Sequence, residues 1–330
     1  MLETYIYLLC KIVIFDENIH LNPFLSICIP AYNQPDLILR CLNSIKSQDY
    51  TSYEVIITDD SADDSVSNVI KSFQDKINVK YYKNDFSLGS PKNWNRAIEF
   101  ASGDLILVLH HDDWLINNDS LSCFIEPFIL DPNIDFVFSK IDFIENRFFK
   151  KIYRQLCQNQ INEPLLLIQD NFVGPPSNVM FKSNLNQFFN EDYIWLVDIE
   201  FYLRLLSDHK IFFYINKNLI DTGRHEAQIT QKLIGKHHIK FLEYNNILKK
   251  YFRKKHVPFR LYDFYWRILR NGGEDLYKKI VLEKDPTFNL NTLSNFHINC
   301  QMHIPKLLLH NKVFSRLAIL VTYIFYKLLS

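Results

Sequence analysis

Short apolar runs alternate with helix-like segments between Pro23 and Lys140, and this alternation constrains the fold more than any other feature. The apolar runs predict strands, and the segments between them carry apolar residues at the three- and four-residue spacing of a helix. Strands are expected at 24–29, 54–58, 79–82 and 104–109, and helices at 37–45, 65–73 and 94–101. Such alternation is typical of an α/β fold with a mainly parallel sheet and helices on both faces.

Beyond Lys140 the alternation stops, which suggests a different organisation. Gly174-Pro175-Pro176-Ser177 predicts a turn, and Val197–Leu206 predicts a helix. From about Lys236 onward the pattern is helical, basic and aromatic. We therefore expect an N-terminal extension at 1–22, an α/β domain at 23–235 with a second half that begins at 141, and a basic helical C-terminal region at 236–330.

The charges of the chain are unevenly distributed although their sum is zero. Residues from Lys232 onward carry 18 Lys and Arg against 6 Asp and Glu, a net charge of +12, and the preceding residues carry −12. An acidic body suits a metal site, and a basic region suits a polyanion such as lipid headgroups. Nucleic acid is the weaker reading of the basic region, because the acidic body would repel it. A basic amphipathic C-terminal region is typical of a membrane surface, and an ordinary solvated basic face is the alternative.

Polar side chains follow three of the predicted strands at the point where each strand ends. The first strand leads into Pro30-Ala31-Tyr32-Asn33, the second into Asp59-Asp60, and the fourth into His110-His111-Asp112-Asp113. The carboxyl ends of parallel strands meet at one edge of a sheet, where ligands bind. Two acidic pairs that face one crevice repel each other unless a cation joins them. We therefore expect a divalent cation, Mg²⁺ or Mn²⁺, with oxygen ligands.

Each of these groups also has a simpler interpretation. Asp59-Asp60 could cap the helix that follows, as acids after strands often do. Asp112-Asp113 is a weaker candidate for a cap, because Asn118 or Asp119 stands closer to the next helix. His110 and His111 could be metal ligands, but histidines in this position are more often packed beside a site than part of it.

The segments that carry these groups resemble a known family. SICIPAYNQPDLILRCLNSIKSQ, YEVIITDDSADDS and LGSPKNWNRAIEFASGDLILVLHHDDW follow one another between Ser26 and Trp114. In this order and spacing they resemble the family 2 glycosyltransferases. The third segment carries two motifs, and four motifs in order are a specific signal. The resemblance implies a GT-A-type nucleotide-binding sandwich and an inverting enzyme that uses a nucleotide-diphospho-sugar.

The resemblance also implies roles for individual residues around the donor. Pro30, Ala31, Tyr32 and Asn33 look like the start of the nucleotide pocket. Asp60 resembles the carboxylate that binds the base, and Asn95 looks like part of the pocket wall. Asp112-Asp113 resembles the metal-binding element, with Asp113 as the direct ligand and Asp112 towards the ribose or a bound water.

A looser resemblance covers the acceptor side. Residues 195–205 (WLVDIEFYLRL) look like the family's acidic helix, with Asp198 at the position of the catalytic base. Val197 stands where the family has its first acid, so Glu191 or Asp192 is an alternative near the acceptor. Asp198 could otherwise be a carboxylate that only stabilises a helix N-terminus. His225 resembles a loop histidine that reaches the metal or the diphosphate, and an ordinary exposed histidine is the alternative.

Together these patterns predict a hexosyl- or related transferase that builds cell-surface polysaccharide. It would take a nucleotide sugar donor and a glycan or lipid-linked acceptor. A non-catalytic nucleotide-sugar-binding subunit and a nucleotidyltransferase are the alternatives. No stretch approaches the roughly 20 apolar residues that span a bilayer, and 5–15 is a poor signal peptide. We therefore expect a cytoplasmic protein, with peripheral contact at the inner face of the membrane through its C-terminal region.

Overall fold

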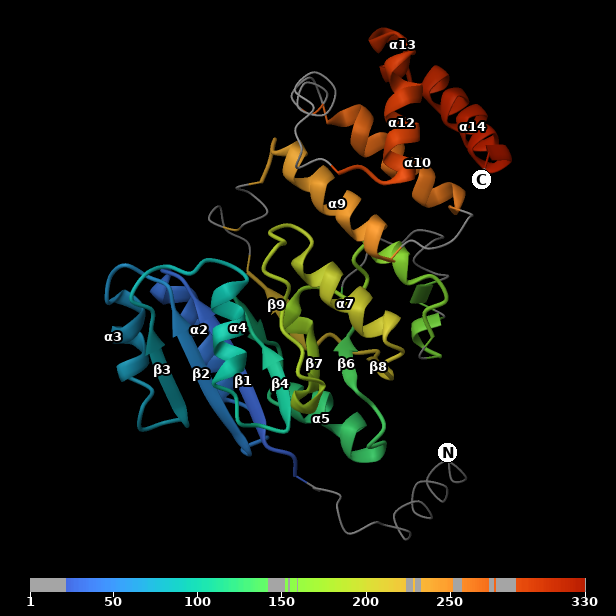
Figure 1. Cartoon of the computed structure of the whole chain (residues 1–330). Coiled ribbons are helices and arrows are strands. Elements are labelled where there is room, and N and C mark those ends of the chain that lie inside the picture. Colours follow the sequence, from blue (N-terminus) through green and yellow to red (C-terminus); the bar gives the residue numbers. More distant parts are fainter. Residues whose placement is uncertain are drawn as a thin grey trace, which may run out of the picture. The chain divides into compact units, whose positions relative to one another are not determined.

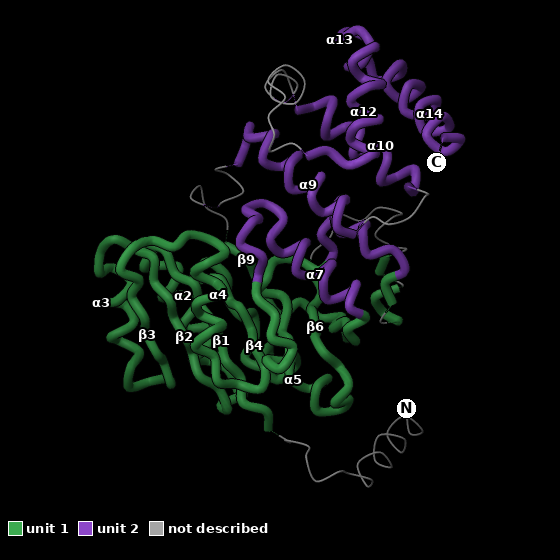
Figure 2. The backbone as a smooth tube through the Cα atoms, viewed as in Figure 1, with its two compact units in different colours: residues 1–161, 173–188, 209–223 green, residues 162–172, 189–208, 224–330 purple. Residues whose placement is uncertain are grey.

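The computed structural model describes residues 22–141, 152–153, 155–158, 160–223, 228, 233–251, 257–272, 276 and 289–329. The chain forms two compact units, which Figure 2 distinguishes by colour. Unit 1 comprises Met1–Ile161, Val173–Phe188 and His209–Gly223, and unit 2 comprises Asn162–Phe172, Phe189–Asp208 and Arg224–Ser330. The domain boundaries expected from the sequence remain a prediction.

Unit 1 is built on a seven-stranded sheet in the order β3-β2-β1-β4-β7-β6-β8 (Figure 1). β1 pairs in parallel with β2 and β4, β2 with β3, and β6 with β8, whereas β7 runs antiparallel to β4 and β6. The strands are β1 Leu25–Ala31, β2 Tyr53–Asp59, β3 Val79–Lys83, β4 Leu105–Val108, β6 Phe136–Ser139, β7 Val179–Lys182 and β8 Phe212–Ile215. The expected mainly parallel sheet is confirmed.

The helices of unit 1 form because their apolar residues recur on one side. α2, for example, buries Ile38, Cys41, Leu42 and Ile45, which lie one helical turn apart. These residues join alternate residues of β1, β2 and β4 in one apolar core, together with residues of α3 and α5. α4 contacts β1 and β2 and has its own buried residues, Ala97 and Ile98. The helices are α2 Pro35–Lys46, α3 Ser65–Lys71, α4 Lys92–Glu99 and α5 Ser120–Leu130, with 3-10 turns η2 Pro176–Asn178 and η3 Ser183–Leu185.

A small second sheet was not foreseen from the sequence. β5 Asp113–Leu115 pairs antiparallel with β9 Ile220–Thr222, which places Asp113 opposite Thr222. Both strands have three residues, too short for a periodic pattern. Their pairing brings a segment from about 110 residues further along the chain next to the acidic pair.

Unit 2 is helical, as predicted for the C-terminal region. It contains η1 Pro164–Ile168, α7 Val197–Ser207, α9 His237–Tyr251, α10 Phe259–Asn271, α12 Thr292–Met302, α13 Lys306–His310 and α14 Lys312–Leu329. The largest fully buried side chains here are aromatic and include Tyr262, Tyr265 and Trp266 of α10. His297 of α12 packs edge-on against Tyr262 with ring centroids 4.2 Å apart, and burial lowers the pKa of His297 to about 3. This histidine is therefore a neutral core residue.

Glu54 joins three neighbouring strands of unit 1 at the end opposite the acidic pairs. Its buried carboxylate accepts hydrogen bonds from the Ser26 hydroxyl (2.7 Å), from the Ser102 amide (2.8 Å) and hydroxyl (2.7 Å), and from Lys80 Nζ (2.6 Å). Burial by itself raises the pKa of Glu54, but these donors outweigh it and lower the pKa from 4.5 to about 2. The ionised form is therefore part of the folded state.

Glu54→Gln should destabilise the protein by about 1.5–3 kcal/mol at pH 7, the usual range for hydrogen bonds to a charged group. Because the folded-state pKa is depressed, the contribution is complete above about pH 4.5 and is lost as the pH falls towards 2. Urea unfolding at several pH values should show the two proteins converging in acid. The exposed Glu126→Gln serves as the control. A constant difference down to pH 2.5 would contradict this account.

Candidate active site

The ends of β1, β2 and β4 lie at one edge of the sheet, as the sequence predicts. β1 lies between β2 and β4, and backbone hydrogen bonds join the strand ends. Asp60 N donates to Ala31 O (3.0 Å), and Leu109 N donates to Cys28 O (2.9 Å). His111 Nδ1 lies 3.1 Å from Pro30 O, and since a carbonyl only accepts, this nitrogen carries the proton. His111 thus fixes the end of β1.

Asp60 does not cap a helix but holds a loop. Its buried carboxylate accepts hydrogen bonds from Leu88 N (3.1 Å), Gly89 N (2.7 Å), the Ser87 hydroxyl (3.3 Å) and the Asn84 side chain. Gly89 has a φ of 72°, a conformation that other residues rarely adopt. Asp60 therefore orders the chain between β3 and α4 at the sheet edge. A contact of Asp60 with a nucleotide base stays a prediction.

Asn93 ties this loop to the strand ends, whereas the family resemblance singled out Asn95 as part of the pocket wall. The Asn93 side chain donates to Thr58 O (3.0 Å) and Ala31 O (3.3 Å) and accepts from the Asn84 side chain (2.9 Å). Asn95 is also buried on α4. The two asparagines belong to one N-x-N motif. The motif marked this part of α4, but it could not show that Asn93 bridges the strands.

The turn after β1 has an unusual backbone. Asn33 and Gln34 both have a φ of 56°, in the left-handed region. Asn33 N donates to the Ser61 hydroxyl (2.6 Å), and that hydroxyl donates in turn to Asp59. Tyr32 is 45% exposed at this turn. The structure therefore brings the predicted residues 30–33 and Asp60 to the same edge, with an aromatic ring open to solvent.

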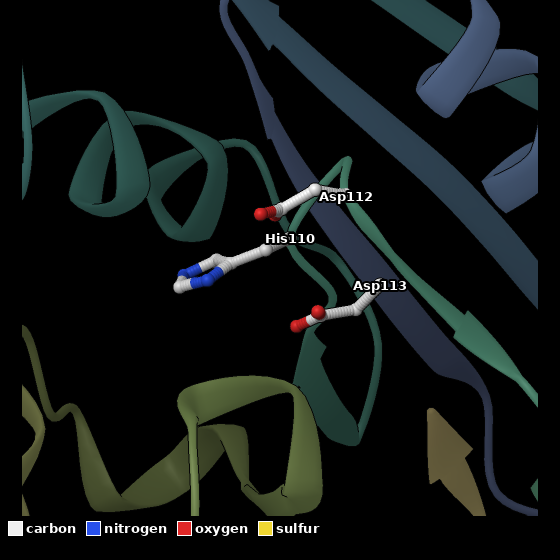
Figure 3. A group of neighbouring side chains, drawn as sticks. All are labelled: His110, Asp112 and Asp113. Carbon is white, nitrogen blue, oxygen red and sulfur yellow. The ribbon is translucent and has the colours of Figure 1, made fainter. Parts of the chain in front are cut away.

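His110, Asp112 and Asp113 form an acidic cluster next to this edge. One ligand atom of each lies within 4.8 Å of the others, and Figure 3 shows their side chains extending to the same side. The Trp94 ring packs on the His110 ring with centroids 4.5 Å apart. Among the described residues, His110 Nε2 is buried with no hydrogen-bond partner. From the sequence, His110 was either a metal ligand or a histidine packed beside the site. In the structure it lies where a ligand would lie.

The environment of the cluster sets its protonation. Burial, with the charge of Asp112 as the second cause, raises the pKa of Asp113 to about 8. Burial also lowers the pKa of His110 to about 4, so its ring is neutral at pH 7. A neutral imidazole beside two carboxylates that repel each other is a donor set that a divalent cation satisfies. The residues therefore fit the cation predicted from the sequence.

Two residues distant in the sequence complete the cluster. Ser177 donates to Asp113 Oδ2 and accepts from His110 N (2.9 Å), so it links the two. Gly223 N donates to Asp112 O (2.8 Å), and a Cβ at Gly223 would lie only 2.3 Å from that oxygen. Only glycine therefore fits beside Asp112. The sequence predicted only a turn at Ser177 and did not mark Gly223.

Asp198 lies in unit 2, in the first turn of α7. Its carboxylate accepts from the Asn171 side chain (2.7 Å) and from Ile199 N (2.8 Å). Burial is the main reason that its pKa rises to about 6. A carboxyl group with this pKa can accept a proton at neutral pH, so its environment suits a general base. That Asp198 faces the acidic cluster stays a prediction.

The chain before Asp198 is held by a residue of α9. Glu243 is buried and accepts hydrogen bonds from Ile194 N (2.7 Å), Trp195 N (2.9 Å) and Leu196 N (2.7 Å). Glu200 of α7 accepts hydrogen bonds from two other residues of α9, Lys250 Nζ (2.8 Å) and the Tyr251 hydroxyl (2.8 Å). Two carboxylates thus join α7 to α9 and fix the backbone that carries Asp198.

The remaining predicted residues have simpler outcomes. Arg204 forms an ion pair with Glu200 within α7 at 3.3 Å, a contact that holds the helix. Glu191 and Asp192 are exposed. His225 lies outside the described residues, and its role stays a prediction.

Comparison with known proteins assigns the region that carries this site. The family model described as Glycosyl transferase family 2 matches residues 26–198. The uncharacterized protein MT1568 of Mycobacterium tuberculosis is 28% identical over 225 residues, 62% of this chain and 68% of that protein. The UDP-Glc:alpha-D-GlcNAc-diphosphoundecaprenol beta-1,3-glucosyltransferase WfgD of Escherichia coli is 26% identical over 187 residues, 56% of this chain and 71% of that protein. Two further matches are shorter: the GalNAc(5)-diNAcBac-PP-undecaprenol beta-1,3-glucosyltransferase of Campylobacter jejuni is matched over 31% of its length, and the poly(ribitol-phosphate) beta-N-acetylglucosaminyltransferase TarS of Staphylococcus aureus over 17%.

The fold is shared with a solved structure. The mannosyltransferase PcManGT from Pyrobaculum calidifontis, in complex with GDP-Man and Mn²⁺, superposes with a TM-score of 0.57 at 12% sequence identity. The superposition covers 99% of this chain and 93% of that chain. The predicted GT-A fold is therefore confirmed.

Ser177→Ala should lower the affinity of the cluster for Mn²⁺ about tenfold, because it removes the donor that orients Asp113. Titration followed by the paramagnetic signal of free Mn²⁺ measures this affinity. Ser72→Ala, an exposed serine at the end of α3, is the matched control. Equal affinities for all three proteins would show that Ser177 does not orient a ligand.

Proposed function

Because the chain belongs to glycosyl transferase family 2, we propose that it is an inverting transferase of sugars from a nucleotide diphosphate donor to a glycan or lipid-linked acceptor. The observation that carries the proposal is the cluster of His110, Asp112 and Asp113 beside the loop that Asp60 orders. Both lie at the carboxyl edge of the sheet, where open α/β sheets bind their ligands.

The cluster would hold Mg²⁺ or Mn²⁺ through Asp113 and Asp112, with His110 as a third donor. A cation there would offset the negative charge that grows on the departing diphosphate. Ser177 orients the Asp113 carboxylate, and Gly223 keeps the Asp112 backbone in place. His225, predicted as a further ligand, would add a contact to the metal or diphosphate.

The nucleotide would bind along the edge from Pro30 to Asn33 and the loop 84–89. Tyr32 offers an exposed ring there, and Asp60 holds the amides of Leu88 and Gly89. Buried Asn95 would form part of the pocket wall, and Asp112 would reach the ribose. Ordering of this edge before the donor arrives reduces the entropy lost on binding.

Asp198 would remove the proton of the acceptor hydroxyl. A hydroxyl is a weak nucleophile at neutral pH, and a carboxylate within hydrogen-bond reach of it makes attack feasible. The oxygen then bonds to the anomeric carbon while the bond to the diphosphate breaks on the opposite side. The sugar is transferred in one displacement with inversion, and nucleoside diphosphate is released.

The names of the relatives support a proposal for the acceptor and for the place of the reaction. The Escherichia coli relative is named for a diphosphoundecaprenol acceptor. A lipid-linked acceptor of this kind would put the reaction at the inner, cytoplasmic face of a membrane, in the synthesis of cell-surface polysaccharide. The E. coli relative's named acceptor supports this placement, and the chemistry above does not depend on it.

A panel of UDP-, GDP- and dTDP-sugars with Mn²⁺ or Mg²⁺ tests the proposal. At least one should raise the melting temperature and release nucleoside diphosphate. Asp113→Ala should lose both effects. Asp198→Asn should keep the thermal shift and lose about 10²–10⁴-fold in turnover, the usual contribution of a general base.

The exposed Asp75→Asn is the control for charge loss. Release of pyrophosphate would indicate a nucleotidyltransferase. Donor binding without turnover under any condition would indicate a non-catalytic binding subunit, and no binding at all would end the proposal.

The rate should also depend on pH in a defined direction. Asp198 is a base only when ionised, and its pKa lies at about 6. Turnover at saturating donor should therefore fall about tenfold per pH unit below pH 6 and level off above it. The residual rate of Asp198→Asn should lack this acidic limb. An identical limb in that variant would assign it to another group.

A further inference from the structure

α13 and α14 expose a large apolar surface in unit 2. Leu307 is 90% and Leu328 is 78% exposed, although leucine is normally buried. Nine further apolar residues of these two helices are exposed as well: Leu308, Val313, Phe314, Leu317, Leu320, Val321, Ile324, Phe325 and Leu329. We call these eleven residues the outward apolar face. Patches of this kind mark binding surfaces in soluble proteins.

On α14, the outward apolar face and the buried side that packs against unit 2 are different sides of the helix. Val313, Leu317, Leu320, Ile324 and Leu328 recur every three or four residues and thus form one stripe. The buried residues Ser315, Ile319 and Tyr326 lie on the opposite side of the same helix.

The buried side docks α14 on its neighbours within unit 2. The Tyr326 ring packs against Tyr262 of α10 (5.8 Å) and Phe296 of α12 (5.2 Å), and Ser315 accepts a hydrogen bond from Arg270 (2.9 Å). These contacts hold α14 against α10 and α12 along its buried side. No helix among the described residues is both long and apolar enough to cross a membrane.

The charged residues of α13 and α14 are all basic. No Asp or Glu follows Asp285, whereas Lys306, Lys312, Arg316 and Lys327 do. All four lysines and arginines are exposed, and Lys312 and Arg316 lie one turn apart on the same side of α14. An apolar stripe flanked by basic residues matches an anionic lipid surface, in which headgroups meet the charges and acyl chains meet the stripe.

We propose that the outward apolar face binds an anionic phospholipid bilayer, with α14 lying in the plane of the headgroups. A second copy of the chain is a poorer match, because two such faces would bring their basic flanks together. The surface deepens the proposed function by giving the membrane side of the enzyme. It does not depend on the sugar chemistry, so each can fail without the other.

Co-sedimentation of the full chain with vesicles tests the proposal. The protein should bind vesicles of phosphatidylglycerol and phosphatidylcholine, and bind pure phosphatidylcholine at least tenfold more weakly. Ile324→Glu should abolish binding, and the double variant Lys312→Glu/Arg316→Glu should weaken it more than tenfold, since each basic residue near anionic lipid contributes about fivefold. Ile211→Glu is the matched control, because Ile211 and Ile324 are 50% and 51% exposed.

Release of nucleoside diphosphate with donor alone or a water-soluble acceptor should be the same in all variants. Equal vesicle binding by Ile324→Glu and the parent chain would overturn the proposal. So would binding that disappears on deletion of residues 1–21 but persists in Ile324→Glu. Light scattering tests whether a second copy of the chain binds the outward apolar face instead. A stable dimer that Ile324→Glu dissociates, without vesicle binding by the parent chain, would identify the face as an interface between copies and overturn the proposal.

Discussion

The parallel pairing of β1 with both β2 and β4 is the constraint on which the candidate site depends. The register places Ala31 opposite Asp59 on one side and Cys28 opposite Val108 on the other. All three strands therefore end at one edge, and the polar residues that follow them have to share it. A slip of one residue would turn every side chain of β1 to the other face of the sheet. The apolar core beneath β1 prevents such a slip.

Acidic groups can gather at this edge because each is held by specific donors. Asp60 is satisfied by the loop 84–89, and Asp113 by Ser177. Burial, followed by the charge of Asp112, raises the pKa of Asp113 to about 8. A divalent cation bound to the two carboxylates would offset the repulsion between them. Stability and ligand binding thus oppose each other at this position.

In unit 2, too, buried carboxylates are held by specific hydrogen-bond donors. Glu243 and Glu200 join α7 to α9, so the C-terminal helices are part of the framework that carries Asp198. Farther along, α14 buries one side against α10 and α12 and leaves an apolar side exposed. The helical region therefore both supports a candidate catalytic residue and offers a surface to a partner.

The sequence by itself determined the elements whose patterns are local. The strands β1 to β4, the helices α2 and α7, and the order of their polar ends all follow from periodicity within a few residues, as does the acidic pair after β4. Tertiary structure alone decided which distant residues meet them. Ser177, Gly223 and Glu243 act on residues 47 to 111 positions away in the chain, and no local pattern marks such partners. Asn93, one of two asparagines in the N-x-N motif, bridges the strand ends, because helix phase and packing decide which strands its amide reaches. Hydrophobic periodicity is a property of neighbouring residues, whereas hydrogen bonds between elements exist only once the chain has folded.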